Sequence, residues 1–126
     1  MFTPAMLDHL QNPRNSGELP PPAITVEVTN PVCGDILRLS IVIEENRLRD
    51  VRFKTRGCVA AIASGSLLTE LIKGKSIEEA GRLRPEDISA GLGGLPPESG
   101  HAAILATDAL KSALEMAIRT SREREP

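Results

Sequence analysis

The stretch VRFKTRGCVAAIAS, residues 51–64, contains the point at which the chain changes from strand to helix periodicity. Apolar or β-branched residues alternate with basic ones over residues 51–56, which is the two-residue repeat of a strand with one buried face. After Gly57 the residues become small and apolar, and a helix is expected over residues 58–73. The stretch therefore predicts a strand that passes directly into an alanine-rich helix, with Cys58 at the junction.

Two further strands are predicted upstream of this stretch. Apolar and polar residues alternate over Ile24–Thr29, and four apolar side chains share one face of Asp35–Glu44. Glu45 and Asn46 are turn residues that connect the second strand to the third. The three strands are therefore expected to pair as an antiparallel meander.

Capping residues and prolines mark the predicted helices. Thr3 and Pro4 are a helix cap and a first-turn proline, and Ser76 with Glu79 has the pattern of a capping box. The predicted helices cover Ala5–Gln11, Cys58–Lys73, Ser76–Glu79, Pro85–Asp87 and His101–Arg122. Because most helices follow the strands, the expected fold class is α+β, with a three-stranded antiparallel sheet and about four to five helices packed mainly on one face. The chain, residues 1–126, is expected to form a single domain with a long C-terminal helix.

The composition argues against several classes of protein. The 15 basic and 17 acidic residues give a formal charge of -2, which lacks the positive surface that nucleic acid or an anionic membrane requires. No apolar run approaches the roughly 20 residues that span a bilayer, and the first residues do not resemble a secretion signal. Two cysteines are too few for a disulfide-stabilised secreted protein. We therefore expect a cytoplasmic protein, and the composition leaves its oligomeric state open.

Residue types that bind metals occur at three ends of predicted elements. Cys33 and Asp35 flank Gly34 before the second strand, Cys58 begins a helix, and His101 begins the last helix. The dipole at a helix N-terminus is expected to lower the pKa of the Cys58 thiol. Two thiolates, a carboxylate and an imidazole complete a tetrahedral shell for zinc or iron. Core packing of each cysteine and a capping role for the histidine are the alternatives, and the spacing matches no C-x-x-C motif, so the residues alone leave the choice open.

Other polar features have plainer interpretations. His9 is interpreted as an exposed or partly buried helix residue without a chemical role. The small residues 64–66 suit close packing of their helix. The basic residues Arg52, Lys54 and Arg56 are suited to an acidic partner surface, but an exposed strand face explains them equally well, and we favour that interpretation.

Several short motifs, taken together, resemble the signatures of one protein family. They are NPRN at 12–15, NPVCGD at 30–35, FKTRGC at 53–58, AIAS at 61–64, KGKS at 73–76 and LPP at 95–97, followed by His101. In this order they are similar to the scaffold family of iron-sulfur cluster assembly, the IscU and NifU N-terminal type. The resemblance covers nearly the whole chain.

The resemblance implies a function and a set of ligands. It implies a scaffold, not an enzyme, that receives sulfur from a cysteine desulfurase and iron from an iron donor. Such a scaffold holds iron or a [2Fe-2S] cluster and passes it to recipient apo-proteins. By the same resemblance, Cys33, Asp35, Cys58 and His101 look like the cluster or metal ligands, and the carboxylate of Asp35 looks like the group that tunes cluster lability.

The residue after His101 departs from the family pattern. Ala102 stands where the family has its third cysteine, which is generally the principal sulfur acceptor. Alanine supplies neither a ligand atom nor a nucleophile, so any sulfur must reach Cys33 or Cys58. The remaining ligand set is weaker for soft iron-sulfide chemistry than three thiolates are, and it is relatively better suited to zinc. Two alternatives follow: a zinc-bound sulfur acceptor that serves a cysteine desulfurase, and a paralogue that keeps the fold without assembling clusters.

The stretch that begins at Leu95 also departs from the family. The family's chaperone-recognition segment continues from Leu-Pro-Pro with valine and lysine, whereas this chain has Glu98 and Ser99. An acidic residue in place of an apolar one weakens docking in a hydrophobic groove. Delivery by an Hsp70-type chaperone is therefore not expected.

Overall fold

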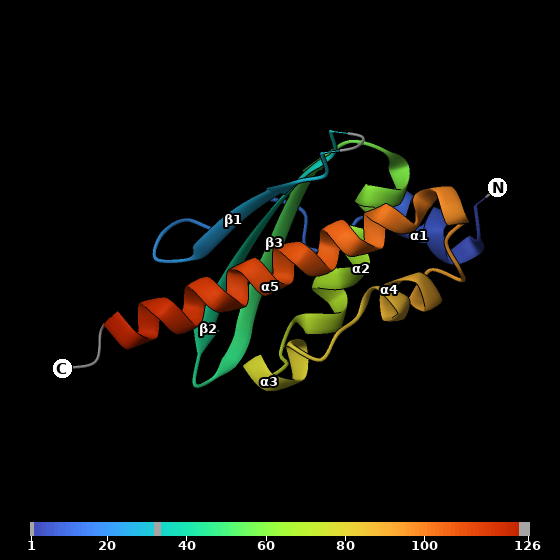
Figure 1. Cartoon of the computed structure of the whole chain (residues 1–126). Helices are drawn as coiled ribbons and strands as arrows, with labels where there is room; N and C mark the ends of the chain where they lie inside the picture. The colour runs from blue at the N-terminus through green and yellow to red at the C-terminus, as the bar shows by residue number, and fades with distance from the viewer. Residues whose placement is uncertain (1, 32–33, 124–126) are drawn as a thin grey trace.

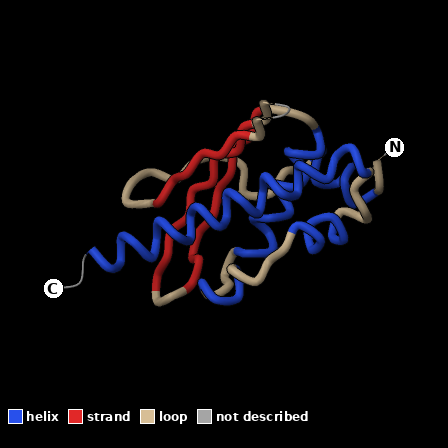
Figure 2. Tube along the Cα trace, in the orientation of Figure 1, coloured by secondary structure: helices blue, strands red, loops and turns tan. Residues whose placement is uncertain are grey.

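The structure is a computed structural model, and it describes residues 2–31 and 34–123. The described elements are α1 (Pro4–Gln11), β1 (Ile24–Thr29), β2 (Ile36–Glu44), β3 (Arg47–Arg56), α2 (Val59–Ile72), α3 (Ile77–Ala80), α4 (Pro85–Gly91), the 3-10 turn η1 (Pro97–Ser99) and α5 (Gly100–Glu123). Figures 1 and 2 show the sheet with the long helix α5 lying across it. The predicted α+β class and the long C-terminal helix are confirmed.

The sheet has the predicted meander order β1-β2-β3, with both neighbouring pairs antiparallel. β3 begins at Arg47, earlier than the alternation of residues 51–56 indicated. The pairing of β2 with β3 shifts register between Val42 and Ile43, and Arg49 is the extra, bulged residue on β3. The bulge brings Leu48 and Val51 to the same buried face although they lie three residues apart. The two-residue repeat is interrupted there, which is why periodicity alone missed the start of the strand.

The helices cover one face of the sheet, as predicted. α5 packs on β1 and β2, while α2 packs on β3 and against α5. Small residues allow this close approach: a Cβ atom at Gly65 would lie 2.7 Å from Cδ2 of Phe53 beneath it. The alanines of α5 that are buried against the rest of the core are Ala102, Ala103, Ala106, Ala109, Ala113 and Ala117. Among the described helices, none is both long enough and apolar enough to cross a bilayer.

α1 is held against α2 by a buried polar contact. His9 is only 5% exposed, and its Nδ1 lies 2.7 Å from Oγ of Ser66, which also accepts a hydrogen bond from the backbone N-H of Arg14. Nε2 of His9 lies 3.8 Å from the carboxylate of Glu70. Burial, followed by the charge of Arg14, lowers the pKa of His9, although Glu70 and the neighbouring Asp8 act in the opposite direction. His9 is therefore a buried anchor, which corrects the sequence-based interpretation of it.

Candidate metal centre

Three elements bring one metal-ligand side chain each to one end of the sheet. Asp35 directly precedes β2, Cys58 is the N-cap of α2, and His101 lies in the first turn of α5. One ligand atom from each residue can be chosen so that all three lie within 4.8 Å of one another. In Figure 1 this is the end at which β3 passes into α2. Cys33, the fourth predicted residue, lies outside the described residues.

Two glycines give the backbone the conformations that this arrangement needs. Gly34 has a φ of +76°, and Gly57 has a φ of +153°, values that L side chains rarely adopt. A Cβ atom at Gly57 would also lie 2.3 Å from Oδ1 of Asp35. Glycine at 57 thus makes room for the carboxylate as well as ending the strand. The sequence-based interpretation missed this second role, because nothing in the sequence places Asp35 against residue 57.

Asp35 is the centre of the cluster. Its side chain is buried, with the residue 5% exposed. The backbone N-H of Cys58 donates to Oδ1 at 3.3 Å, and the Cys58 thiol donates to Oδ2 at 3.1 Å. Nε2 of His101 lies 3.9 Å from the same Oδ2. One carboxylate oxygen therefore faces both the thiol and the imidazole, and the carboxylate is oriented by the start of α2.

The pKa of the Cys58 thiol is raised, which corrects the expectation of a lowered value. Partial burial is the main cause, and the hydrogen bond to Asp35 adds to it. Backbone N-H groups of Ala61 and Ala60 at the start of α2 act in the expected direction and lower the pKa, but they do not outweigh the first two effects. In the metal-free protein the thiol is thus a proton donor to Asp35. A bound cation reverses this preference, because it stabilises the thiolate directly.

The donor atoms suit a transition metal. A thiolate, an imidazole and a carboxylate are all ligands that zinc and iron accept, and three protein ligands leave a further position for another group. Cys58 is exposed, so the cluster is open to solvent on its side. Ala102, next to His101, is fully buried among core residues.

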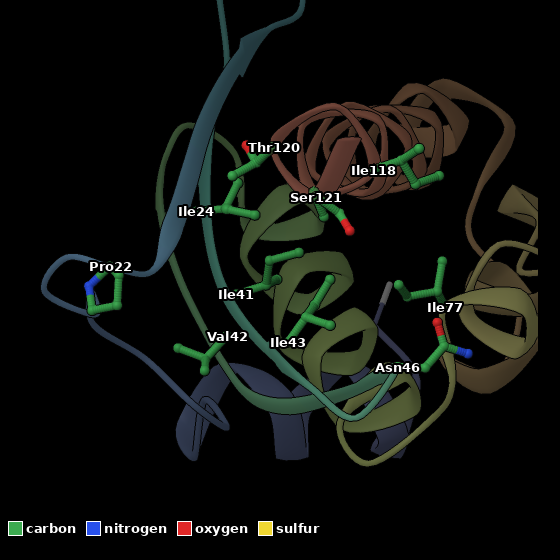
Figure 3. A pocket seen from close by; sticks show the side chains of 11 residues that line it. Pro22, Ile24, Ile41, Val42, Ile43, Asn46, Ile77, Ile118, Thr120 and Ser121 are labelled. Atoms are coloured by element: carbon green, nitrogen blue, oxygen red, sulfur yellow. The ribbon is translucent and has the colours of Figure 1, made fainter. Parts of the chain in front are cut away.

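Two hollows lie away from these residues. A hollow of about 560 Å³ opens at the hairpin end of the sheet, where α5 does not fill the space above β2. Figure 3 shows that isoleucines contribute much of its apolar wall, namely Ile24, Ile41, Ile43, Ile77 and Ile118. A second hollow of about 400 Å³ lies over β2 and β3 and includes Arg38, Lys54 and Arg56. Neither of these two hollows, as lined by the described residues, contains Asp35, Cys58 or His101.

Comparison with known proteins identifies the family. The model of the NifU-like N terminal domain matches residues 1–123. The chain belongs to this family. The family resemblance predicted from the motifs is thereby confirmed.

Proteins named for iron-sulfur cluster assembly share much of the sequence. The iron-sulfur cluster assembly scaffold protein IscU of Haemophilus influenzae is 44% identical over 117 residues, which cover 90% of this chain and 92% of that protein. The iron-sulfur cluster assembly enzyme IscU of Drosophila melanogaster is 49% identical over 113 residues, which cover 86% of this chain and 73% of that protein.

 The crystal structure of the N-terminal part of a nitrogen-fixing NifU-like protein from Brucella abortus is similar to this chain with a TM-score of 0.67 at 18% identity, and the match covers 98% of this chain and 95% of that chain. At this level of identity the likeness shows the fold alone.

Proposed function

We propose that this chain is a scaffold-type protein of iron-sulfur cluster assembly, which binds iron or a [2Fe-2S] cluster and transfers it to recipient apo-proteins. The observation that carries the proposal is the convergence of Asp35, Cys58 and His101, whose ligand atoms lie within 4.8 Å of one another although they come from three separate elements. The names of the Haemophilus and Drosophila relatives support the same function.

The proposed ligands are Cys58, Asp35 and His101, with Cys33 as the fourth. A metal ion that enters between the first three replaces the proton that Cys58 shares with Asp35, so binding releases a proton and strengthens as the pH rises. Thiolates favour iron-sulfide chemistry, whereas a carboxylate is a harder and weaker ligand for it. Asp35 is therefore the ligand that a thiolate of the recipient protein replaces at the lowest cost in free energy. This suits a protein that transfers its bound cluster.

The proposed partners are a cysteine desulfurase, an iron donor and the recipient apo-proteins. The protein itself needs no catalytic residue in this function, because the desulfurase supplies the sulfur. A second candidate is a zinc-bound sulfur acceptor that serves the same desulfurase. The mixed sulfur, oxygen and nitrogen donor set favours it, and so does the exposed thiol of Cys58, because Ala102 cannot accept sulfur.

Anaerobic reconstitution with ferrous iron, sulfide and a cysteine desulfurase tests the first proposal. We expect the visible absorption of a [2Fe-2S] cluster, with matching iron and sulfide content. The double variant Cys33→Ala/Cys58→Ala and the variant His101→Gln are expected to lose most of it, whereas His9→Gln, a histidine change outside the cluster, keeps it. Cluster content no higher than in the double variant overturns the proposal. Mass spectrometry after incubation with the desulfurase tests the second candidate, which fails if neither cysteine carries a persulfide.

A further inference from the structure

The open face of the sheet carries a row of cations that the helices leave uncovered. Two of the three basic residues singled out in the sequence, Lys54 and Arg56, are exposed on this face. The third, Arg52, donates to Oδ1 of Asp50 at 2.6 Å and is thereby neutralised. Arg38 of β2 lies beside these two residues, because the register puts it directly opposite Lys54. We refer to Arg38, Lys54 and Arg56 as the basic strip.

The charges of the basic strip are only partly balanced within the protein. Arg38 forms ion pairs with Glu18 at 3.2 Å and with Glu27 at 3.5 Å. Lys54 and Arg56 form no ion pair with any residue that the structure describes. Like charges directly opposite each other on one face of an antiparallel pair destabilise the sheet. The repulsion between the cations of the strip therefore lowers the stability of the sheet. These positive charges are concentrated on one face of a chain whose formal charge is -2.

The surroundings of the strip are shaped for a ligand that lies across the strands. The hollow of about 400 Å³ over β2 and β3 is lined by all three cations, together with Glu27, Ile36 and Thr55. Ile36 is half-buried and gives this hollow an apolar element. Arg56 is separated from Cys58 by Gly57 alone, so the strip ends beside the candidate metal centre.

We propose that the basic strip docks a carboxylate-rich segment of a partner protein. Residues two apart on one strand are separated by roughly 6.5 Å, and Arg38 lies opposite Lys54, so the three cations are spread along and across the strands. Separate carboxylates along a polypeptide can pair with each cation in turn, and charge-assisted bonds from arginine to carboxylate are the strong ones. Because Glu18 and Glu27 already pair with Arg38, Lys54 and Arg56 are the cations of the strip that offer their charge to a partner.

The docked partner would lie next to Cys58, but the proposal does not depend on a bound metal. The proposal is therefore tested with the metal-free full chain and a fluorescently labelled octaglutamate peptide, by anisotropy at about 20 mM and about 150 mM salt. The charge-reversal variant Lys54→Glu/Arg56→Glu is compared with Lys111→Glu/Arg119→Glu, which makes the same change in net charge on exposed positions of α5.

We expect binding at low salt that weakens about tenfold or more in the strip variant and by less than about threefold in the α5 variant. Thermal unfolding of both variants shows whether each is folded, and removal of like charge is expected to leave the strip variant at least as stable as the native chain. Equal weakening in the two variants means that binding follows net charge alone and overturns the proposal. Tighter binding of a single-stranded oligonucleotide of equal charge overturns it as well, and so does the absence of peptide binding at low salt.

Discussion

Replacing Gly57 with alanine perturbs the candidate metal centre without changing any proposed ligand. The new Cβ atom would lie 2.3 Å from Oδ1 of Asp35, far inside van der Waals contact. The carboxylate, which is buried, must therefore move away from the start of α2. Gly17 is the matched control, because its φ of +130° is also unfavourable for alanine but nothing lies within 4 Å of the position of its Cβ atom.

The magnitude follows from the two separate costs. Backbone strain applies to both variants and costs about 1–3 kcal/mol. Gly57→Ala in addition disrupts the hydrogen bonds that the Asp35 carboxylate accepts from Cys58, and a hydrogen bond to a charged group contributes about 1.5–3 kcal/mol. With the loss of one such hydrogen bond, we therefore expect a decrease in stability of about 2.5–6 kcal/mol for Gly57→Ala and of about 1–3 kcal/mol for Gly17→Ala.

Urea denaturation of the metal-free proteins measures the two free energies of unfolding, and titration with zinc or ferrous iron measures the affinity of the centre. Displacement of an oriented ligand is expected to weaken metal binding by about 10- to 100-fold in Gly57→Ala, while Gly17→Ala keeps the native affinity. Equal stability losses together with equal affinities in the two variants would refute the reasoning, because they would show that the contact between residue 57 and Asp35 does not orient the carboxylate.

Three further predictions concern packing, pH and thiol reactivity. Gly65→Ala is expected to lower the free energy of unfolding by about 1–3 kcal/mol, because the added methyl group overpacks the contact between α2 and the sheet. Gly100→Ala is the control and is expected to cause no such loss, because its methyl group meets open space. Urea denaturation measures the free energy of unfolding of both variants. Because the pKa of His9 is lowered in the folded protein, the unfolded chain binds a proton at a higher pH than the folded chain does. The free energy of unfolding should therefore fall as the pH drops below about 6.5, and His9 should not change it above that pH. The loss should be absent in His9→Gln, and an identical pH profile would contradict this assignment. Asp35→Asn should lower the pKa of the Cys58 thiol in the metal-free protein, because the carboxylate no longer holds its proton, and site-resolved alkylation with iodoacetamide at neutral pH should become faster; an unchanged rate would contradict that cause.

Local patterns were sufficient where the physical cause is local. The capping box of Ser76 and Glu79 is present with both reciprocal hydrogen bonds, because all of its atoms lie within one turn. The strand-to-helix switch at Gly57 and Cys58 also follows from neighbouring residues, and Cys58 is the N-cap of α2. Packing of α2 and α5 on one sheet face follows from the small residues that each helix carries.

Contacts between distant segments were not predictable in the same way. The start of β3 at Arg47 depends on a bulge that is defined only by pairing with β2. The burial of His9 depends on Ser66, which lies 57 positions further along the chain. The raised pKa of Cys58 depends first on partial burial and then on the carboxylate of Asp35, which accepts the thiol proton, and both are set by distant segments.

The sequence by itself determined the elements, their order, the sheet topology and the family, because periodicity, caps and motifs are properties of neighbouring residues. It also nominated Asp35, Cys58 and His101 as residues of metal-ligand type, and their role as ligands stays a proposal. Only the tertiary structure decided that these three side chains lie within 4.8 Å of one another and that Gly57 makes room for the carboxylate. The physical reason is that burial, electrostatic pairing and steric fit depend on distances through space between segments that the chain itself places far apart.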